Sequence, residues 1–187
     1  VRAIRALQES DVCIVLIDAG QGLESQDLNL IGLAIRYRKG IVLMVNKWDL
    51  ITKDHHTADQ HKKRVLEKLA PNDFIPVLFT SVLKKQRVFK AIETAMTVYE
   101  NRRRRVATSA LNDALLPAIQ KNPPPALKGK HIKIKYATQL PVSTPAFAFF
   151  CNFPKYIKAP YARFIENRIR EAFDFTGVPI RVFFRNK

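Results

Sequence analysis

Apolar and polar positions in the first hundred residues follow two alternating periods. Three short runs are typical of buried strands: 12–17 and 41–45 are continuously apolar, and 76–82 is apolar up to Phe79 before it reaches Thr80 and Ser81. Apolar residues also recur at the spacing of amphipathic helices in three segments, 1–9, 25–38 and 88–99, and a polar helix with a basic cluster is expected at 57–69. Strands that alternate with helices predict an α/β fold with a parallel sheet and flanking helices. The run 41–45 is expected to be buried on both faces of that sheet.

Sequence signals also mark helix ends and inward faces in this part. Ser25 is expected to cap the helix 25–38, and Gly40 to stand at its end. The residues expected to face inward from the second and fourth helices are Leu28, Ile31, Ile35, Val88, Ile92, Ala95 and Tyr99.

The remaining residues predict a second domain with a short sheet. Its expected elements are a helix at 109–121, strands at 132–136 and 146–151, a helix at 161–173 and a strand at 180–184. Ile132, Ile134 and Tyr136 alternate with Lys133 and Lys135, as in a strand with one wet, basic face. Gly177-Val178-Pro179 is expected to end the second helix. The order α-β-β-α-β is an α+β arrangement.

Charge separates the two parts. The chain of 187 residues has a net charge of +16, of which residues 1–100 carry +3 and residues 101–187 carry +13. The second part is therefore expected to bind nucleic acid or another polyanion, although a basic face can also complement an acidic neighbouring domain. The run Arg102-Arg103-Arg104-Arg105 is interpreted as a solvated linker, with a phosphate grip as the alternative. The domains are placed at 1–105 and 106–187.

The apolar runs and the two cysteines indicate the cellular compartment of the protein. No apolar run approaches the roughly 18 residues of a membrane span, and no signal-peptide pattern opens the chain. Cys13 and Cys151 lie in apolar strands of different domains, where buried, reduced thiols are the ordinary state. We therefore expect a cytoplasmic protein that makes no membrane contact.

The candidate chemistry lies where the run 41–45 ends in Asn46-Lys47-Trp48-Asp49. Open α/β sheets bind ligands outside the carboxyl ends of their strands. The Asp49 carboxylate suits guanine, because it can accept two parallel hydrogen bonds from N1–H and the exocyclic amine, which adenine cannot supply. A site built on such bonds rejects the wrong base by roughly 10⁴-fold or more. Asn46 is expected to bond the other edge and tie loops together, and the Lys47 stem to cover the base.

A second segment supports this interpretation. The run 76–82 ends in Ser81-Val82 and is followed by Leu83, one helix after the first loop. Backbone N–H groups of residues 81–83 are expected to reach a base oxygen. The alternative is that the segment Asn46 to Asp49 is only a polar exit from its strand.

The chain resembles the C-terminal part of the EngA/Der family, bacterial GTPases with two tandem G domains and a KH-like domain. The resemblance is carried by motifs spread along the whole chain: Asn46 to Leu50, Gln86 to Val88, Val98 to Asn101, Thr108 to Asn112, Pro123 to Pro125, Lys130 to Gln139, Glu166 to Arg170 and Gly177 to Ile180. It implies the latter half of the second G domain followed by the KH-like domain. Where the family usually has Ser-Ala, this chain has Ser81-Val82.

The resemblance also implies ligands and partners. They are GTP or GDP, with Mg²⁺ in a complete parent, a neighbouring G domain of that parent, and rRNA of the large ribosomal subunit during its assembly. The alternatives are a stand-alone basic RNA- or ribosome-binding module whose G-like half is only scaffold, and a protein-interaction module whose KH-like groove holds a neighbouring domain.

Several phosphate and metal motifs do not occur in the sequence. No Gly-x-x-x-x-Gly-Lys-Ser/Thr is present, and the loop Asp18 to Gly22 has Gln21 where Asp-x-x-Gly requires glycine. No two glycines have the Gly-x-x-Gly spacing of RNA-binding KH domains. His55, His56 and His61 do not share a helix face well, so zinc is not expected. We expect no metal ligands, no catalytic residues and no GTP hydrolysis from these 187 residues alone, because phosphoryl transfer depends on groups around phosphate and magnesium.

Overall fold

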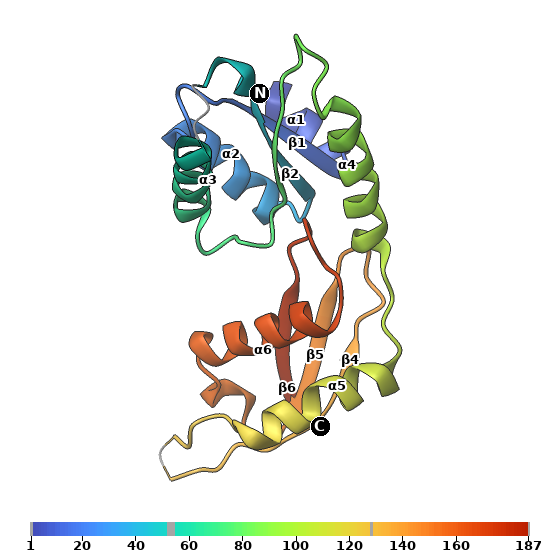
Figure 1. The fold of residues 1–187 in the computed structure, drawn as a ribbon. Helices are drawn as coiled ribbons and strands as arrows, with labels where there is room; N and C mark the ends of the chain where they lie inside the picture. Colours follow the sequence, from blue (N-terminus) through green and yellow to red (C-terminus); the bar gives the residue numbers. More distant parts are fainter. Residues whose placement is uncertain (1, 52–54, 128, 187) are drawn as a thin grey trace. The chain divides into compact units, whose positions relative to one another are not determined.

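The computed structural model describes residues 2–51, 55–127 and 129–186, shown in Figure 1. The chain divides into two compact units. The first contains Val1–Asn101 together with Thr176–Pro179, and the second contains Arg102–Phe175 together with Ile180–Lys187. The predicted domain boundary after residue 105 falls in the segment between two helices and stays a prediction.

The first unit is built on a parallel sheet with the strand order β1-β2-β3. Its strands are β1 (Val12–Asp18), β2 (Gly40–Asn46) and β3 (Val77–Phe79), and its helices are α1 (Arg2–Glu9), α2 (Ser25–Arg36), the short 3₁₀ helix η1 (Trp48–Leu50), α3 (His55–Leu69) and α4 (Val88–Arg103). The predicted parallel sheet with flanking helices is confirmed.

The central strand β2 has helices packed on both of its faces, as its sequence predicts. Ile41, Leu43 and Val45 belong to a cluster with residues of α1, α2 and α3. Val42 instead packs with Val98 of α4. All five residues of the run 41–45 are at most 5% exposed, because β2 has a strand on either side and helices on both faces.

The expectation of a buried β1 is wrong for one face of that strand. Ile14 is 42% exposed and Leu16 is 53% exposed. An open groove beside Ile14 is bordered by Ile92 and Met96 of α4. Ile92, expected to face inward, is 51% exposed. The physical reason is that β1 is an edge strand of this three-stranded sheet, so its α4-side face has less helix cover than that of the central strand β2.

The ends of α2 differ from the prediction. The N-cap is Glu24 rather than Ser25, and Glu24 forms a reciprocal capping box with Asp27. After the helix, Arg38 takes the left-handed backbone conformation with φ of 57°. Gly40 begins β2 instead, where a Cβ atom would lie 2.5 Å from Val98, so close packing requires the glycine. On the buried face Ala34 accompanies Ile31, whereas Leu28 is 36% exposed.

The segment Thr176–Pro179 belongs to the first unit and is held by backbone hydrogen bonds. Ile41 N–H donates to the Gly177 carbonyl over 2.7 Å, and Gly177 N–H donates to the Phe74 carbonyl over 2.7 Å. The Asn101 amide nitrogen donates to the Thr176 carbonyl over 3.2 Å. Gly177 was expected to end a helix, but α6 ends at Ala172 and the glycine serves these contacts instead.

The second unit confirms the predicted order α-β-β-α-β. Its elements are α5 (Thr108–Lys121), β4 (Ile134–Gln139), β5 (Ala146–Cys151), η2 (Pro154–Tyr156), α6 (Ala159–Ala172) and β6 (Arg181–Asn186). The sheet has the order β4-β5-β6, with an antiparallel first pair and a parallel second pair. Its core joins Phe147 and Phe149 of β5 to Leu115 of α5 and Ile165 of α6.

The two cysteines are both free thiols. Cys151 is buried, and desolvation raises the pKa of its thiol. Cys13 is only half-buried, unlike the expectation, because it lies on the edge strand β1, where its sulfur is 3.3 Å from the Ser10 hydroxyl. Among the helices that the structure describes, none has both the length and the apolar composition of a membrane span.

Candidate guanine-binding site

The strand β2 delivers the first loop of the site at its carboxyl end. Lys47 follows the strand in a left-handed conformation, with φ of 61°, and this turns the chain into η1. Trp48 N–H then donates to the Thr80 carbonyl over 3.0 Å. The Trp48 ring packs on Phe79 with 4.4 Å between centroids. The residue between the lysine and the aspartate is therefore the anchor that fixes this loop to the end of β3.

Asn46 ties the two predicted loops together. Its side-chain oxygen accepts a hydrogen bond from the Val82 backbone N–H over 3.0 Å. Thr80, two residues before Val82, is 1% exposed and donates its N–H to the Val45 carbonyl over 2.8 Å. The two segments thus form one structure at the carboxyl ends of β2 and β3, as the sequence predicts.

Asp49 lies in a largely enclosed position. Its side chain is only 8% exposed, and the ammonium of Lys84 stands 3.9 Å from one carboxylate oxygen. Lys84 itself is 62% exposed and reaches over from the second loop. Enclosure from water strengthens any hydrogen bond that a carboxylate makes.

The second loop is a compact turn from Ser81 to Gln86. Ser81 is 1% exposed and exchanges backbone hydrogen bonds with Gln86 over 3.2 and 2.8 Å. The Ser81 hydroxyl accepts from Lys84 N–H over 3.2 Å. Val82 and Leu83 are 45% and 89% exposed at the tip. Because the side chain of Val82 sits at an exposed position, the tip accommodates its β-branched side chain.

The ammonium of Lys47 is placed by a residue that sequence reasoning missed. It lies 2.7 Å from the Asp18 carboxylate, and Gly20 N–H donates to the same carboxylate over 2.8 Å. The hydrogen bond from Lys47 lowers the pKa of Asp18, and the partnership raises the pKa of Lys47. Asp18 and Asn46 are register partners at the ends of adjacent parallel strands. The sequence signal that could have identified Asp18 is its place at the carboxyl end of a strand, like that of Asn46.

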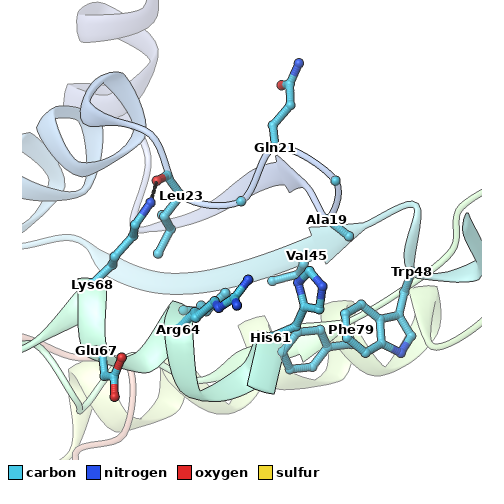
Figure 2. Close-up of a pocket in the computed structure, with 13 residues that line it drawn as sticks. Ala19, Gln21, Leu23, Val45, Trp48, His61, Arg64, Glu67, Lys68 and Phe79 are labelled. Carbon is cyan, nitrogen blue, oxygen red and sulfur yellow. Dashed lines mark hydrogen bonds between the residues drawn. The ribbon is translucent and has the colours of Figure 1, made fainter. Parts of the chain in front are cut away.

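A cavity of about 380 Å³ is lined in part by Trp48 (Figure 2). It is lined by the loop from Ala19 to Leu23, by Val45, Trp48 and Phe79, and by the α3 residues His61, Arg64, Val65, Glu67 and Lys68. Lys68 closes one end by donating to the Leu23 carbonyl over 2.8 Å. None of Asn46, Lys47, Asp49 or 81–83 lines this cavity, so it is distinct from the predicted site.

Among the described side chains, no group of three or more His, Cys, Asp or Glu is placed to hold a metal ion. His61 contacts Trp48 edge-on, with 6.0 Å between ring centroids. The side chains of His55 and His56 lie outside the described residues.

Comparisons with known proteins decide the family. A family model described as the KH-domain-like C-terminal domain of EngA bacterial GTPases matches residues 105–185. A model of the elongation factor Tu GTP binding domain matches residues 2–121, which is more than half of the chain. The chain belongs to the EngA/Der family of GTPases. This confirms the resemblance and the GTPase-type fold expected from the sequence.

Curated relatives align along the whole chain. GTPase Der of Amoebophilus asiaticus is 55% identical over 186 residues, and GTPase Der of Porphyromonas gingivalis is 47% identical over 188 residues. Both alignments cover 100% of this chain but 43% of the relative. The chain therefore spans less than half the length of these EngA/Der proteins.

Solved structures show more distant likeness. A bacterial selenocysteine-specific elongation factor, EF-Sec, has 13% identity and a TM-score of 0.46, over 57% of this chain and 18% of that chain. Era of Aquifex aeolicus has 17% identity and a TM-score of 0.44, over 98% of this chain and 67% of that chain. Membership of the EngA/Der family rests on the sequence matches and not on these likenesses.

Proposed function

We propose that the first unit reads guanine in a GTP-binding protein that acts in assembly of the large ribosomal subunit in the cytoplasm. The observation that carries the proposal is the hydrogen bond between Asn46 and Val82, which joins the two loops beside an enclosed Asp49. Family membership supports the choice of ligand, GTP or GDP, with Mg²⁺ bound in the complete protein.

Each site residue has a proposed role. Asp49 accepts two hydrogen bonds, one from the guanine N1–H and one from the exocyclic amine. The bound base thereby replaces Lys84 as the partner of this carboxylate. Lys47 covers the base with its stem while Asp18 holds its ammonium. In the second loop, Val82 N–H is engaged by Asn46 and Lys84 N–H by Ser81. We therefore assign the contact with the base oxygen to Leu83 N–H.

Nucleotide exchange tests this assignment. In the full-length protein that contains this chain, Asp49→Asn replaces an acceptor by a donor that faces the guanine amine. We expect the affinity for GDP to fall by roughly 10²-fold or more and that for XDP to rise, because xanthine carries an oxygen at the same place. Fluorescent GDP and XDP titrations measure both. An Asp49→Asn protein that binds GDP as wild type does would refute the site. Asp59→Asn, on α3, serves as the control.

The second unit is proposed to bind rRNA, a role favoured by its charge. Its +13 balance is large, and its few carboxylates lie outside the strands, in α5 (Asp113), in α6 (Glu166 and Glu171) and just after α6 (Asp174). Two of them already pair with arginines of α6. Counterion release should make RNA affinity fall steeply with salt. A shallow salt dependence with strong preference for one motif would contradict an electrostatic mode.

Two other assignments stay open to test. One is a stand-alone basic RNA- or ribosome-binding module whose G-like half is scaffold. The other is a KH-like groove filled by a neighbouring G domain of the same parent. The coding sequence upstream of Val1 separates the first from the proposal, because a P-loop and a further G domain there would support a GTPase. Whether the second unit binds RNA at physiological salt distinguishes the second alternative from the proposal.

A further inference from the structure

The sheet of the second unit carries aromatic and cationic residues on the face that does not join its core. Side chains alternate along β5, so Phe147, Phe149 and Cys151 pack with α5 and α6, and Phe150 lies on the other face. The register places Tyr136 and Arg185 on either side of Phe150, in one row across the three strands. Phe183 occupies the next row. We call Tyr136, Phe150, Arg181, Phe183 and Arg185 the aromatic face.

Contacts within the aromatic face hold its rings in place. Tyr136 and Phe150 stack with 4.5 Å between centroids and 14° between planes. The Arg181 guanidinium stands 4.3 Å from the Phe183 centroid, and that of Arg185 stands 6.0 Å from it. All three rings are half-buried, and Arg185 is exposed. A ring that keeps part of its surface open and has cations beside it offers a stacking surface next to positive charge.

The charged residues of the three strands are all basic. The strands β4, β5 and β6 contain no Asp or Glu, while Lys135, Arg181 and Arg185 lie in them. In the row of Phe183 its register partners are Thr138 and Ala148, which are small. An apolar protein partner would not require Arg181 and Arg185 beside Phe183. A polyanion with flat, apolar rings would use both the arginines and the aromatic rings.

We propose that the aromatic face binds single-stranded RNA, with bases stacked on Phe183 and on the Tyr136–Phe150 pair and with phosphates on Arg181 and Arg185. The proposal deepens the rRNA-binding role proposed above and rests on it. A single strand is required because a duplex hides the faces of its bases. Sequence-tolerant stacking of this kind does not need the Gly-x-x-Gly clamp, which this sequence lacks.

The test compares RNA with an oligomer of equal charge. Fluorescence anisotropy of the 187-residue chain is measured with a labelled oligouridylate of about 12 nucleotides and with an abasic ribose-phosphate oligomer of the same length. Wild type should bind the RNA about 5- to 100-fold more tightly than the abasic oligomer. Phe183→Leu and Phe150→Leu should each reduce that preference several-fold without changing the salt dependence. Arg185→Gln should lower the slope of log K against log salt by about one.

Phe164→Leu is the matched control, because Phe164 is also half-buried and has Arg168 at 5.6 Å, but lies on α6. It should leave the RNA preference unchanged. Circular dichroism and thermal unfolding verify that each variant is folded. If wild type does not distinguish RNA from the abasic oligomer, or the sheet variants match Phe164→Leu, the aromatic face is not a base platform and a protein partner takes its place. If wild type binds neither oligomer at physiological salt, the rRNA-binding role itself fails.

Discussion

The ammonium of Lys47 lies 2.7 Å from the carboxylate of Asp18, across the ends of two adjacent parallel strands. The pair links the loop after β1 to the loop that is proposed to read guanine. It therefore gives Asp18 a positioning role, because the lysine that would cover the base is held by a residue outside its own motif.

Removing this ion pair should show in the pKa of Lys47 and in the pH dependence of stability. In Asp18→Asn the Lys47 pKa is expected to fall toward its ordinary value, as followed by NMR of the lysine side chain. The pair raises the Lys47 pKa, so its stabilisation is present below the ordinary value of 10.5 and is lost as pH rises through the higher folded value. It lowers the Asp18 pKa, so stabilisation is present above the ordinary value of 3.8 and is lost as pH falls through the lower folded value.

The matched comparison is a double-mutant cycle with Lys47→Met. If Asp18 and Lys47 act as a pair, the second substitution should add little to the first in urea unfolding at neutral pH. Purely additive effects, or a pH dependence equal to that of wild type, would show that the two groups do not interact in solution.

Cutting the tie between the two loops should loosen the second one. Asn46→Ala removes the acceptor of Val82 N–H, so the free energy of unfolding should fall by about 1 kcal/mol. Hydrogen exchange at the Val82 amide should accelerate by more than that at the Thr80 amide, which donates to backbone and keeps its partner. Equal protection of Val82 in Asn46→Ala and wild type would contradict the role of Asn46.

Substitutions at two glycines distinguish the cost of backbone strain from the cost of close packing. Gly177 and Gly22 have φ of 75° and 73°, but a Cβ at Gly177 would lie 2.3 Å from Val98, whereas one at Gly22 would meet nothing within 4 Å. Gly22→Ala should cost about 1 kcal/mol of unfolding free energy, and Gly177→Ala should cost roughly 2 kcal/mol more. Chemical denaturation measures both.

The double variant Gly177→Ala/Val98→Ala provides the check. Shortening Val98 removes the methyl groups that the new Cβ would meet, so part of the loss should be recovered relative to the sum of the single variants. Equal costs at the two glycines would mean that the contact between Gly177 and Val98 is not formed in solution.

GTP should bind the 187-residue chain weakly. Association costs several kcal/mol of free energy, because translational and rotational freedom is lost. Contacts to the base alone, without a phosphate-cradling loop, offset little more than this cost. We therefore expect a Kd no tighter than about 1 mM, which corresponds to a binding free energy of roughly −4 kcal/mol. Calorimetry with GTP and Mg²⁺ measures it, and the full-length protein is the positive control. Micromolar binding or turnover above background would show that residues of this chain supply a phosphate site.

Local patterns predicted most of the elements, because continuous apolar runs and helical spacing depend on near neighbours in sequence. The run 41–45 was predicted to be buried on both faces, and the order α-β-β-α-β was predicted correctly. The helix cap was misplaced, because Glu24 and Ser25 are both followed by polar residues and only the backbone geometry shows which one caps. The exposure of Ile14 and Leu16 was also missed, because edge position is a property of the sheet and not of the strand.

The sequence by itself determined the family, the two element orders, the charge asymmetry and the residues proposed to read guanine. These features depend only on residue types and on short spacings along the sequence. Tertiary structure alone decided which groups meet: Asp18 with Lys47, Asn46 with Val82, and Gly177 with Ile41 and Phe74. The physical reason is that these partners are separated by 29 to 136 positions in the chain, and only the register of parallel strands and the path of the loops bring them within hydrogen-bonding distance.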